Sequence, residues 1–518
     1  MDSISEQLPP VFNVAAYFIE GNLVKERSDK TAFYYQDETY TYAQVSSFVR
    51  RTAKLLSNLG LEQENRIAIL VSDTPEFVFT FWGTIWLGAV PILINTGYNT
   101  DDIQYILQDS RAKVLLTTQE WQQKLAPIQS RFLRHVLLID GENSLLSQLA
   151  KLDELLPWAK TSRDEPAFWL YTSGSTGRPK GVIHLHQSMV VCAEQYAKNT
   201  LGLHTDDITY SVANMSFAYG LGNTLYMPMA VGAAAVLSNS NNAFEIITDI
   251  QRYRPTVFFG IPSIYAAILA VYEISPLDVS DLRLCVSAAE QLPKSIWEQW
   301  LKTYNHEICE GIGTTEFLHI FLSNRIGECK PGTSGRPVPG YNVEIVDEDG
   351  VTCPPNTVGN LQVSGESLML GYWNRLSQTR KAIYGHTMRT GDKYLRDTDN
   401  YFRFIGRADD LFKVNGQWIS PMEIEDILHQ HPQILEVAVV PESENGEQLT
   451  QIVAYVSLQQ GHEPSSELEN SIRRFAKQQL PHFKAPKKVH FVEKLPRTAT
   501  GKIHRNLLLK QQNLVHNS

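Results

Sequence analysis

The sequence has few cysteines, and their spacing matches neither a metal site nor a disulfide framework. The five cysteines are scattered along the chain without a CxxC pair, at Cys192, Cys285, Cys309, Cys329 and Cys353. This spacing argues against a zinc site and against a small secreted fold held together by disulfides. We therefore expect a reducing, cytoplasmic setting.

An excess of positive charge is also missing. Lysine and arginine total 46 against 56 acidic residues, which gives a formal net charge of -10. A nucleic-acid-binding protein would be expected to carry a basic face, so we expect no nucleic-acid partner. The hydrophobic share of 43% over 518 residues is that of an ordinary globular protein with several domains, and it suits an enzyme that handles small molecules.

The chain has no clear membrane segment. Its first ten residues contain no basic stretch that leads into an apolar one, so we expect no secretory signal. Phe77–Ile94 carries no charge and approaches the length that spans a bilayer. Because Gly83, Gly88 and Pro91 interrupt it, we predict a buried helix followed by a strand at Val90–Ile94 and no membrane association.

Short β-rich runs alternate with helical patterns over most of the chain. The runs are Arg66–Val71, Ala112–Thr117, His135–Asp140, Ala167–Tyr171, Thr256–Gly260 and Leu282–Ser287. This alternation predicts α/β layers with largely parallel sheets. From about residue 340 the pattern changes to polar-apolar alternation with an Asp-Gly turn, at Asn342–Gly350 and Leu361–Ser364, which is typical of antiparallel strands.

The last part of the chain has the pattern of a separate α+β unit. We predict helices from about Pro421 and from about Ser466, with strands at Val437–Val440, Ile452–Ser457 and Val489–Val492. The predicted fold is thus a large N-terminal α/β domain with parallel sheets and a β-rich subdomain, residues 1–408, and a small mobile α+β C-terminal domain, residues 409–518.

One loop is built to hold phosphate. Tyr171–Gly181 has four hydroxyl side chains other than tyrosine, three glycines and two cations, and it follows the apolar run Ala167–Tyr171. Glycines let backbone N–H groups point at one anion, hydroxyls donate further hydrogen bonds, and Arg178 and Lys180 supply charge. No Gly-Lys-Ser/Thr closes the loop, so it is not a Walker motif.

Four further segments carry groups that could act on a nucleotide. Gly311–Glu316 offers glycines, hydroxyls and a carboxylate suited to Mg²⁺ beside phosphates. Thr390–Asp392 provides a carboxylate at a tight turn, able to accept both hydroxyl protons of a ribose. Gly406–Asp409 adds a guanidinium and a carboxylate, and Pro496–Lys502 places a lysine on a glycine-containing loop. Each segment alone is more often a structural turn.

In this order and spacing, the five segments resemble the adenylate-forming superfamily of acyl-CoA synthetases, carrier-protein adenylation domains and firefly luciferase. The resemblance covers essentially the whole chain and implies an active site between a large and a small domain. It implies that ATP and AMP are bound by Thr172, Ser173, Gly174, Ser175, Thr176, Gly177, Ala289, Glu290, Gly311, Ile312, Gly313, Thr314, Asp392 and Arg407. It implies that the catalytic residues are Lys180, Thr315, Glu316 and Lys502.

The roles implied by the resemblance are distinct. Lys180 and the loop would hold the β- and γ-phosphates, Glu316 would hold Mg²⁺, and Thr315 would contact the α-phosphate. Lys502 would bridge the substrate carboxylate and the α-phosphate, because two negative groups must meet in the first step. The small domain would then rotate about Asp409, removing Lys502 and bringing Gly416 to a pantetheine tunnel for thiol attack by CoA or by the phosphopantetheine of a carrier protein.

The acyl pocket favours an uncharged acid. Amino-acid-activating relatives place a Phe-Asp pair where this chain has Phe217 and Ala218, and Ala218 cannot pair with an ammonium group. The stretches Phe217–Asn223 and Gly311–Asn324 are most similar to those of benzoate–CoA ligases. That resemblance implies an aryl pocket bordered by Phe217, Ala218, Tyr219, Gly220, His319 and Ile320. For Tyr219, His319 and Ile320, ordinary core packing is the alternative.

Two positions depart from the common pattern. Ala289 stands where these enzymes usually have glycine, and Ile312 stands where many superfamily members have tyrosine, which puts the identity of the acid in doubt but removes no catalytic group. The function predicted is ATP-dependent activation of a benzoate-like acid followed by transfer to CoA. A loader of a carrier protein, with no identifiable basic cluster for the 3′-phosphate of CoA, and a catalytically silent nucleotide-binding scaffold remain as alternatives.

Overall fold

The structure is a computed structural model of the chain, and it describes residues 3–152, 156–172, 178–408, 410–414, 417–443, 450–459, 461–497, 503, 505, 507 and 508. The chain forms two compact units. The first unit comprises residues 1–343, 362–388 and 400–402, and the second comprises residues 344–361, 389–399 and 403–518. No helix among the described residues is long and apolar enough to cross a membrane.

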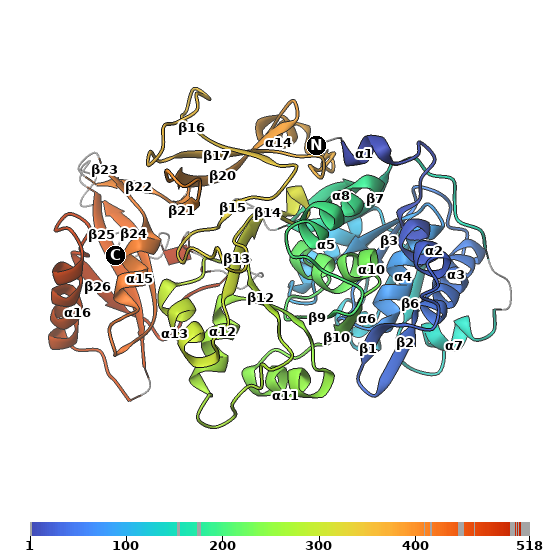
Figure 1. The fold of residues 1–518 in the computed structure, drawn as a ribbon, viewed down its shortest axis with the longest axis horizontal. Coiled ribbons are helices and arrows are strands. Elements are labelled where there is room, and N and C mark those ends of the chain that lie inside the picture. The colour runs from blue at the N-terminus through green and yellow to red at the C-terminus, as the bar shows by residue number, and fades with distance from the viewer. Residues whose placement is uncertain are drawn as a thin grey trace. The chain divides into compact units, whose positions relative to one another are not determined.

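A nine-stranded sheet runs through the first unit (Figure 1). Its order is β15 (Arg336–Pro337), β14 (Ile320–Ser323), β13 (Ile308–Gly313), β12 (Leu284–Ser287), β11 (Val257–Gly260), β9 (Ile208–Ser211), β10 (Ala234–Leu237), β1 (Thr31–Tyr35) and β2 (Glu38–Thr41). The strands from β13 to β1 pair in parallel, and an antiparallel strand lies on each side of this block, β14 next to β13 and β2 next to β1. All parallel strands of the block therefore end at the same edge of the sheet.

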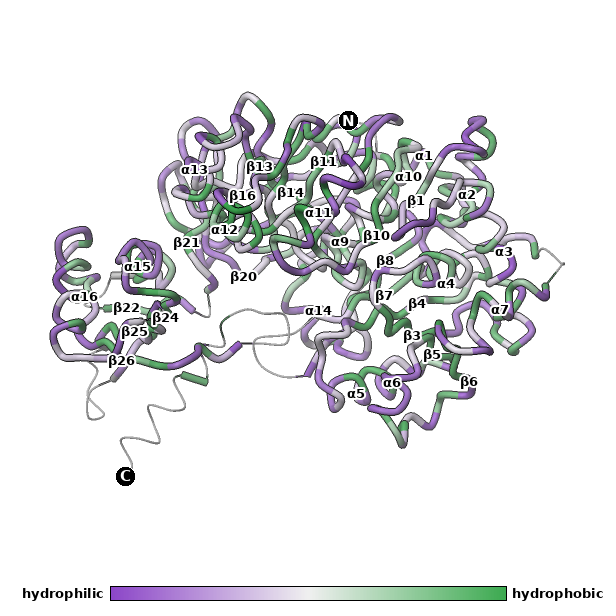
Figure 2. The backbone as a smooth tube through the Cα atoms, turned by 90° about the horizontal axis from the view of Figure 1, so that it is seen from below, coloured by the Kyte–Doolittle hydropathy of each residue, from purple (hydrophilic) through white to green (hydrophobic). Residues whose placement is uncertain are grey.

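A second sheet of the first unit has seven strands. Its order is β18 (Gly371–Tyr372), β8 (Lys180–Leu185), β7 (Pro166–Thr172), β4 (Val90–Leu93), β3 (Arg66–Ile69), β5 (Val114–Thr117) and β6 (His135–Leu138). The strands from β7 to β6 are parallel, and β8 and β18 pair antiparallel. The strands β4 and β5 are fully buried and strongly apolar, and the strands β8 to β6 follow in sheet order in Figure 2. The parallel strands predicted from the sequence are thus confirmed.

Several of the helices that pack on these sheets bury one apolar face, as the helices at Tyr42–Asn58 and Ala243–Tyr253 do, whereas the helix at Pro75–Trp86 is buried on all sides. The helices of the first unit are α1 (Ile4–Gln7), α2 (Val14–Val24), α3 (Tyr42–Asn58), α4 (Pro75–Trp86), α5 (Thr100–Ser110), α6 (Gln119–Lys124), α7 (Leu145–Leu149), α8 (His186–Cys192), α9 (Ala218–Leu221), α10 (Met227–Val231), α11 (Ala243–Tyr253), α12 (Pro262–Ala270), α13 (Lys294–Tyr304) and α14 (Leu376–Ala382). Two π-helical segments (Ala193–Lys198 and Gly222–Tyr226) and the 3₁₀ turn η3 (Thr315–Phe317) complete them.

Apolar side chains of α11, α12 and α13 pack on the strands β9, β11 and β12 and form one core. A second core joins α5 to the strands β3, β4, β5 and β7. The charge-free stretch from residue 77 to residue 94 forms the buried helix α4 and the buried strand β4, as predicted.

The β-rich region forms a five-stranded sheet of β16 (Asn342–Val346), β17 (Gly359–Ser364), β20 (Thr387–Arg396), β19 (Ile383–Tyr384) and β21 (Phe402–Arg407). The rest of the second unit contains β22 (Phe412–Val414) with β23 (Gln417–Ile419), and a three-stranded sheet of β24 (Ile434–Ser443), β25 (Thr450–Leu458) and β26 (Lys488–Phe491). The helices α15 (Pro421–Leu428) and α16 (Ser466–Gln479) pack on that sheet through one apolar core. The predicted α+β pattern is confirmed in both helices and all three strands.

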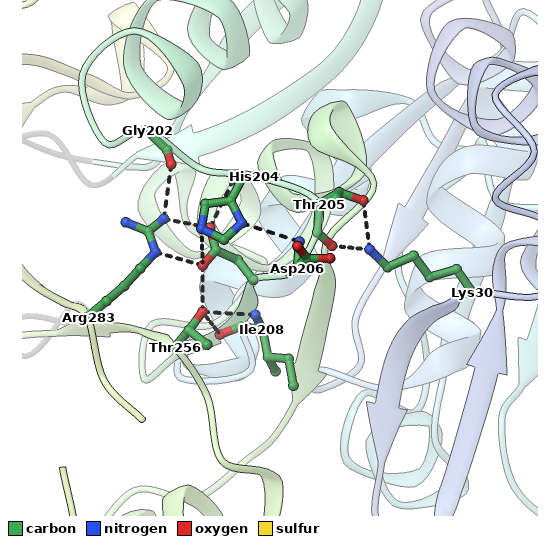
Figure 3. A network of polar contacts seen from close by, with 9 residues as sticks. Lys30, Gly202, His204, Thr205, Asp206, Ile208, Thr256 and Arg283 are labelled. Carbon is green, nitrogen blue, oxygen red and sulfur yellow. Dashed lines mark hydrogen bonds and ion pairs between the residues drawn. The ribbon is translucent and has the colours of Figure 1, made fainter. Parts of the chain in front are cut away.

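The amino ends of three parallel strands, β9, β11 and β12, are joined by a polar network around the buried carboxylate of Asp207 (Figure 3). Asp207, which precedes β9, accepts hydrogen bonds from Arg283 Nε at 2.8 Å, from Thr256 Oγ1 at 2.7 Å and from the His204 backbone N–H at 2.9 Å. Burial acts to raise the pKa of Asp207, but the hydrogen bonds from Arg283, His204 and Thr256 outweigh it and hold that pKa below its ordinary value. The network fixes the starts of β9, β11 and β12.

Candidate active site

The opposite edge of the nine-stranded sheet gathers most of the predicted site residues of the first unit. Phe217–Gly220 follows β9, Ala289 and Glu290 follow β12, and Gly311–Gly313 forms the end of β13. Thr314, Thr315 and Glu316 come directly after β13. Because these strands are parallel, their carboxyl ends meet at one edge, which is where α/β proteins bind ligands.

The predicted phosphate loop connects two paired strands. Strand β7 ends at Thr172 and β8 begins at Lys180, and these two residues face each other in the antiparallel register. Ser173, Gly174, Ser175, Thr176 and Gly177 lie outside the described residues. The two ends of the loop are therefore held side by side as in a hairpin.

The two cations of this loop have different surroundings. Arg178 forms an ion pair with Asp102 of α5 at 3.1 Å and lies over the ring of Tyr105. Lys180 is half-buried, and its Nζ lies 4.5 Å from the centroid of the Tyr372 ring. No carboxylate in the described part of the chain forms an ion pair with Lys180. Of the two, Lys180 is the cation that is left available for an anionic ligand.

The turn that carries Glu316 is anchored through its backbone. The carbonyl of Thr315 accepts a hydrogen bond from His184 Nε2 at 2.8 Å, and the carbonyl of Glu316 accepts one from the Met369 N–H at 2.7 Å. Burial lowers the pKa of His184 to about 4, so the ring is neutral and donates from Nε2. The backbone position of Glu316 is thus set by partners on β8 and on the segment before β18.

The side chain of Glu316 is held at one oxygen. Tyr372 donates its phenolic hydrogen to Glu316 Oε1 at 2.6 Å, while Glu316 Oε2 has no partner among the described residues. Two hydroxyls near the same strand ends, Thr314 Oγ1 and Ser287 Oγ, are buried and also lack a hydrogen-bond partner in the described part of the chain. Such buried polar groups without partners are uncommon and mark a place where a polar ligand would fit.

Glu316 and the neighbouring hydroxyls suit a Mg²⁺ ion that also binds phosphates. They do not suit a metal ion held by protein side chains alone. No cluster of three or more His, Cys, Asp or Glu side chains that could hold a metal ion occurs among the described residues. Mg²⁺ is commonly held by one or two carboxylates together with substrate phosphates, and Glu316 presents one carboxylate oxygen that is not otherwise engaged. The fit is therefore to a metal that arrives with a nucleotide.

The ribose-binding pair predicted from the sequence lies in the second unit, and its two members are in contact. Arg407 Nη1 donates to Asp392 Oδ1 at 2.8 Å and to the Thr390 carbonyl at 3.2 Å, and Asp392 is buried. The tight turn expected at Thr390–Asp392 is wrong, because these residues lie within β20. Gly391 has φ +80°, a left-handed conformation that glycine adopts readily, which explains why the sequence resembles a turn.

The predicted acyl pocket is aromatic and electrically neutral. The rings of Tyr219 and His319 lie 5.7 Å apart, and His319 Nε2 is 3.2 Å from Asn223 Oδ1. Burial lowers the pKa of His319 to about 3, and burial raises the pKa of Tyr219 well above its ordinary value. A Cβ on Gly222 would lie 2.4 Å from His319 Cδ2, so only glycine lets the helix pass this close to the ring.

Ala218 and Ile320 occupy the same region, Ala218 at the start of α9 and Ile320, buried, at the start of β14. Gly220 is the buried third residue of α9, and Phe217 directly precedes that helix. No charged side chain is among the six predicted pocket residues, and a charged amine would find no partner in this set.

Two acidic residues near these groups were not predicted. Glu310, in β13 just before the Gly311–Glu316 segment, is buried and accepts a hydrogen bond from the Leu292 N–H, and burial raises its pKa to about 8. Asp73 is buried after β3 and accepts the Met215 N–H at 3.0 Å, which fixes the loop before Phe217; burial raises its pKa to about 7. Glu310 could have been found from the sequence, because it is the one acidic residue in an apolar strand. The sequence around Asp73 has no comparable feature.

Besides the five loop residues from Ser173 to Gly177, three more predicted residues cannot be placed. Asp409, Gly416 and Lys502 lie outside the described residues, so their roles as hinge, tunnel residue and catalytic lysine stay predictions. The boundary between residues 408 and 409 also stays a prediction.

Comparison with known proteins identifies the family. The model of the AMP-binding enzyme family matches residues 22–373, and the model of the AMP-binding enzyme C-terminal domain matches residues 423–502. The chain therefore belongs to the AMP-binding enzymes, the family of adenylate-forming ligases that the sequence motifs indicate. Its fold, a large α/β domain with parallel sheets and a smaller C-terminal domain, is the fold of this family.

Similar proteins act on aromatic acids. The chain is 39% identical over 506 residues to the benzoate–CoA ligase of Thauera aromatica, covering 96% of each chain. It is 38% identical to the 4-hydroxybenzoate–CoA/benzoate–CoA ligase of Rhodopseudomonas palustris, covering 96% of this chain and 94% of that one. The crystal structure of the anthranilate CoA ligase AuaEII in complex with anthranoyl-AMP matches 99% of this chain and 100% of that chain at 35% identity, with a TM-score of 0.93.

Proposed function

We propose that this protein is an aromatic acid–CoA ligase that activates benzoate or a small substituted benzoate. It joins the acid to ATP as acyl-AMP with release of pyrophosphate, and then transfers the acyl group to the thiol of CoA with release of AMP. Three observations carry this proposal. Lys180 forms no ion pair among the described residues, Glu316 has one oxygen without a partner among them, and the neighbouring predicted pocket residues Tyr219 and His319 are neutral. Likeness over nearly the whole chain to two benzoate–CoA ligases supports it.

In the first step, charged side chains of the protein offset the negative charges of ATP and of the acid. Lys180 binds the β- and γ-phosphates, and Thr315 contacts the α-phosphate. Lys502 bridges the attacking carboxylate and the α-phosphate, so that the repulsion between two anions is reduced. Asp392, held by Arg407, accepts the ribose hydroxyls. Glu316 would hold Mg²⁺, which supplies positive charge for the departing pyrophosphate.

The acyl pocket orients the acid and excludes charged analogues. Tyr219 and the neutral ring of His319 offer flat surfaces to an aromatic ring. An α-amino acid would bury its ammonium group without a partner in this pocket, at a cost of several kcal/mol. The pocket therefore selects for an uncharged acyl group.

The acceptor in the second step is CoA in this proposal, and a phosphopantetheine-bearing carrier protein is the second candidate. The absence of a basic cluster for the 3′-phosphate of CoA in the sequence is the observation that favours the carrier protein. A silent nucleotide-binding scaffold is disfavoured, because Lys180, Glu316, Asp392, Arg407 and Lys502 are all retained.

Pyrophosphate release with a panel of carboxylic acids tests the proposal. We expect release with benzoate and with hydroxy- or amino-substituted benzoates, and little release with acetate or with α-amino acids. Release with no acid of the panel would rule out an enzymatic function. Preference for an aliphatic acid would leave an acid ligase but overturn the aromatic assignment.

A further inference from the structure

Tyr372 touches both charged groups that the proposed function assigns to ATP and its metal ion. Its hydroxyl donates to Glu316 Oε1 at 2.6 Å, and its ring faces the ammonium group of Lys180, with Nζ 4.5 Å from the centroid. The three residues come from three separate elements, β18, η3 and β8. One side chain therefore joins the carboxylate and the lysine without being charged itself.

Tyr372 is held rigidly from the backbone. It pairs with Val182 in the β18–β8 register, its own N–H donates to Thr379 Oγ1 at 3.0 Å, and the next residue, Trp373, donates its N–H to the Gly181 carbonyl at 2.8 Å. Only 8% of Tyr372 is exposed, and the side chain packs with Val182 and Met369. Its place is thus fixed independently of Glu316 and Lys180.

Glu316 and Lys180 carry opposite charges, and a direct ion pair between them would satisfy both and leave neither for a ligand. No such ion pair exists in the described part of the chain. The ring of Tyr372 offers Lys180 a cation–π contact, which attracts the ammonium group but leaves its three N–H donors largely available. The hydroxyl of Tyr372 engages one oxygen of Glu316 and leaves the other open.

We propose that Tyr372 is a positioning residue that keeps Glu316 and Lys180 apart and pre-oriented, one for the metal ion and the other for the phosphates. This inference rests on the proposed function, because it takes the roles of Glu316 and Lys180 from it. Groups that orient a metal ligand through a hydrogen bond commonly account for 10- to 100-fold in metal affinity, so the hydroxyl alone is expected to matter.

The turn that carries Glu316 does not depend on this hydroxyl. His184 and Met369 hold the backbone of the turn from other directions. Tyr372→Phe removes the hydroxyl and keeps the ring, so it should release the carboxylate without unfolding the turn and without changing the contact with Lys180. Tyr372→Leu removes both contacts and lets Lys180 approach Glu316.

Binding measurements separate the two contacts. Mg²⁺ is titrated into the full-length enzyme with ATP present and no acid, so that no reaction occurs, and binding is followed by calorimetry and by tryptophan fluorescence. Trp373, whose ring lies against that of Trp169 with centroids 4.6 Å apart, is the neighbouring reporter. ATP without Mg²⁺ is titrated in a second series. Thermal unfolding of each variant is recorded alongside.

We expect Tyr372→Phe to weaken apparent Mg²⁺ affinity about tenfold and to leave the affinity for metal-free ATP within about twofold. We expect Tyr372→Leu to weaken both, because the lysine is then drawn to the carboxylate. Tyr40→Phe is the matched control. It also removes a tyrosine–glutamate hydrogen bond, between Tyr40 and Glu38 on β2, which carries no predicted site residue. It should change neither affinity.

The inference is overturned if Tyr372→Phe leaves the affinity for Mg²⁺ unchanged. It is also overturned if the variant weakens the affinity for metal-free ATP as strongly as the affinity for Mg²⁺. Should either Tyr372 variant fail to fold, Glu316→Gln decides, since unchanged Mg²⁺ affinity there removes the carboxylate role on which the inference depends. Pyrophosphate release by the wild-type enzyme with benzoate is independent of these titrations. Failure of the proposed function and failure of this inference are therefore seen in different experiments.

Discussion

Buried polar groups have hydrogen-bond partners at the amino ends of the parallel strands of the nine-stranded sheet, and in the described part of the chain two of them lack partners at the carboxyl ends. At the amino ends, Asp207 is buried and bonded to Arg283, Thr256 and His204, so that each of its oxygens has a partner. At the carboxyl ends, the hydroxyls of Ser287 and Thr314 are buried and have no partner among the described residues. The same sheet thus stabilises the fold at one edge and leaves binding capacity at the other.

The comparison predicts that substitutions in the Asp207 network and substitutions among the predicted ATP-binding residues separate stability from activity. Asp207→Asn should lower the free energy of unfolding by about 2 kcal/mol, because it breaks an ion pair whose carboxylate is buried and leaves the partly exposed Arg283 without that partner. The KM for ATP, measured well below the unfolding temperature, should stay unchanged. Chemical denaturation with steady-state kinetics measures both.

Asp278→Asn is the matched control for Asp207→Asn. It removes a carboxylate from an exposed ion pair with Arg254 in the same unit, and exposed pairs contribute little to stability. A loss of stability at Asp278 as large as at Asp207 would contradict the distinction between buried and exposed pairs.

A change at Lys180, which begins β8 in the seven-stranded sheet, should have the reverse effect of Asp207→Asn. Lys180→Met should lower kcat/KM for pyrophosphate release about 100-fold, a loss of about 2.7 kcal/mol in transition-state stabilisation, because the phosphates lose a cation. Stability should change little, since Lys180 forms no ion pair with a carboxylate in the described part of the chain.

Arg178→Met is the control on the same loop. Arg178 is already paired with Asp102 of α5, so its loss should reduce kcat/KM less than tenfold. Equal losses at Arg178 and Lys180 would show that the ion pair with Asp102 does not decide which cation serves the phosphates.

The buried acid at the binding edge predicts a pH dependence of stability. Burial raises the pKa of Glu310 from 4.5 to about 8, so in the folded protein it stays neutral while in the unfolded chain it ionises. The contribution of Glu310 to the free energy of unfolding is therefore lost as pH rises from 4.5 through about 8. Glu310→Gln removes this loss and keeps an oxygen for the Leu292 N–H, so the variant should gain in unfolding temperature over the wild type between about pH 5 and about pH 9.

A constant difference in unfolding temperature between Glu310→Gln and the wild type across that pH range would show that Glu310 is not the buried acid that titrates.

Two buried histidines, His184 and His186, change stability at the acid end of the pH range. Burial lowers the pKa of His184 and His186, so they reduce stability as pH falls below their ordinary range, and the Gln variant should keep this acid limb.

The smallest effect concerns backbone strain at the same edge. Ala289 has φ +72°, a left-handed conformation that costs a residue with a side chain about 1 kcal/mol or more. Ala289→Gly should therefore raise the free energy of unfolding by about 0.5–1 kcal/mol. Ala288→Gly, at a buried neighbour without positive φ, should lower it instead, and thermal unfolding of the two variants shows the difference in sign.

Local patterns predicted much of the fold, whereas the nucleotide-binding residues were implied by the resemblance to adenylate-forming enzymes. The runs at β3, β5, β11 and β12 are strands because they are short, largely apolar and buried on both faces. Asp392 and Arg407 were assigned to one task from separate motifs, and the structure brings them into contact.

Contacts between positions far apart in the chain could not be predicted from the sequence. Tyr372 and Glu316 are 56 positions apart, and Asp73 and Met215 are 142 apart, so no periodicity or spacing links them. The pairing of β18 on β8 and of the loops beyond β3 and β9 brings these residues together. The strand at Thr390–Asp392 was misread for a local reason, because a glycine with positive φ can lie within a strand as well as close a turn.

The most direct test of the account is the yield of aryl-CoA from benzoate, ATP, Mg²⁺ and free CoA, counted by mass spectrometry against AMP and pyrophosphate. We predict one benzoyl-CoA for each AMP and each pyrophosphate, with a rate that saturates below about 1 mM CoA. Pyrophosphate release without saturation by free CoA, together with fast transfer to a carrier protein, would contradict the ligase assignment. Absence of pyrophosphate under these conditions would contradict benzoate as the acid.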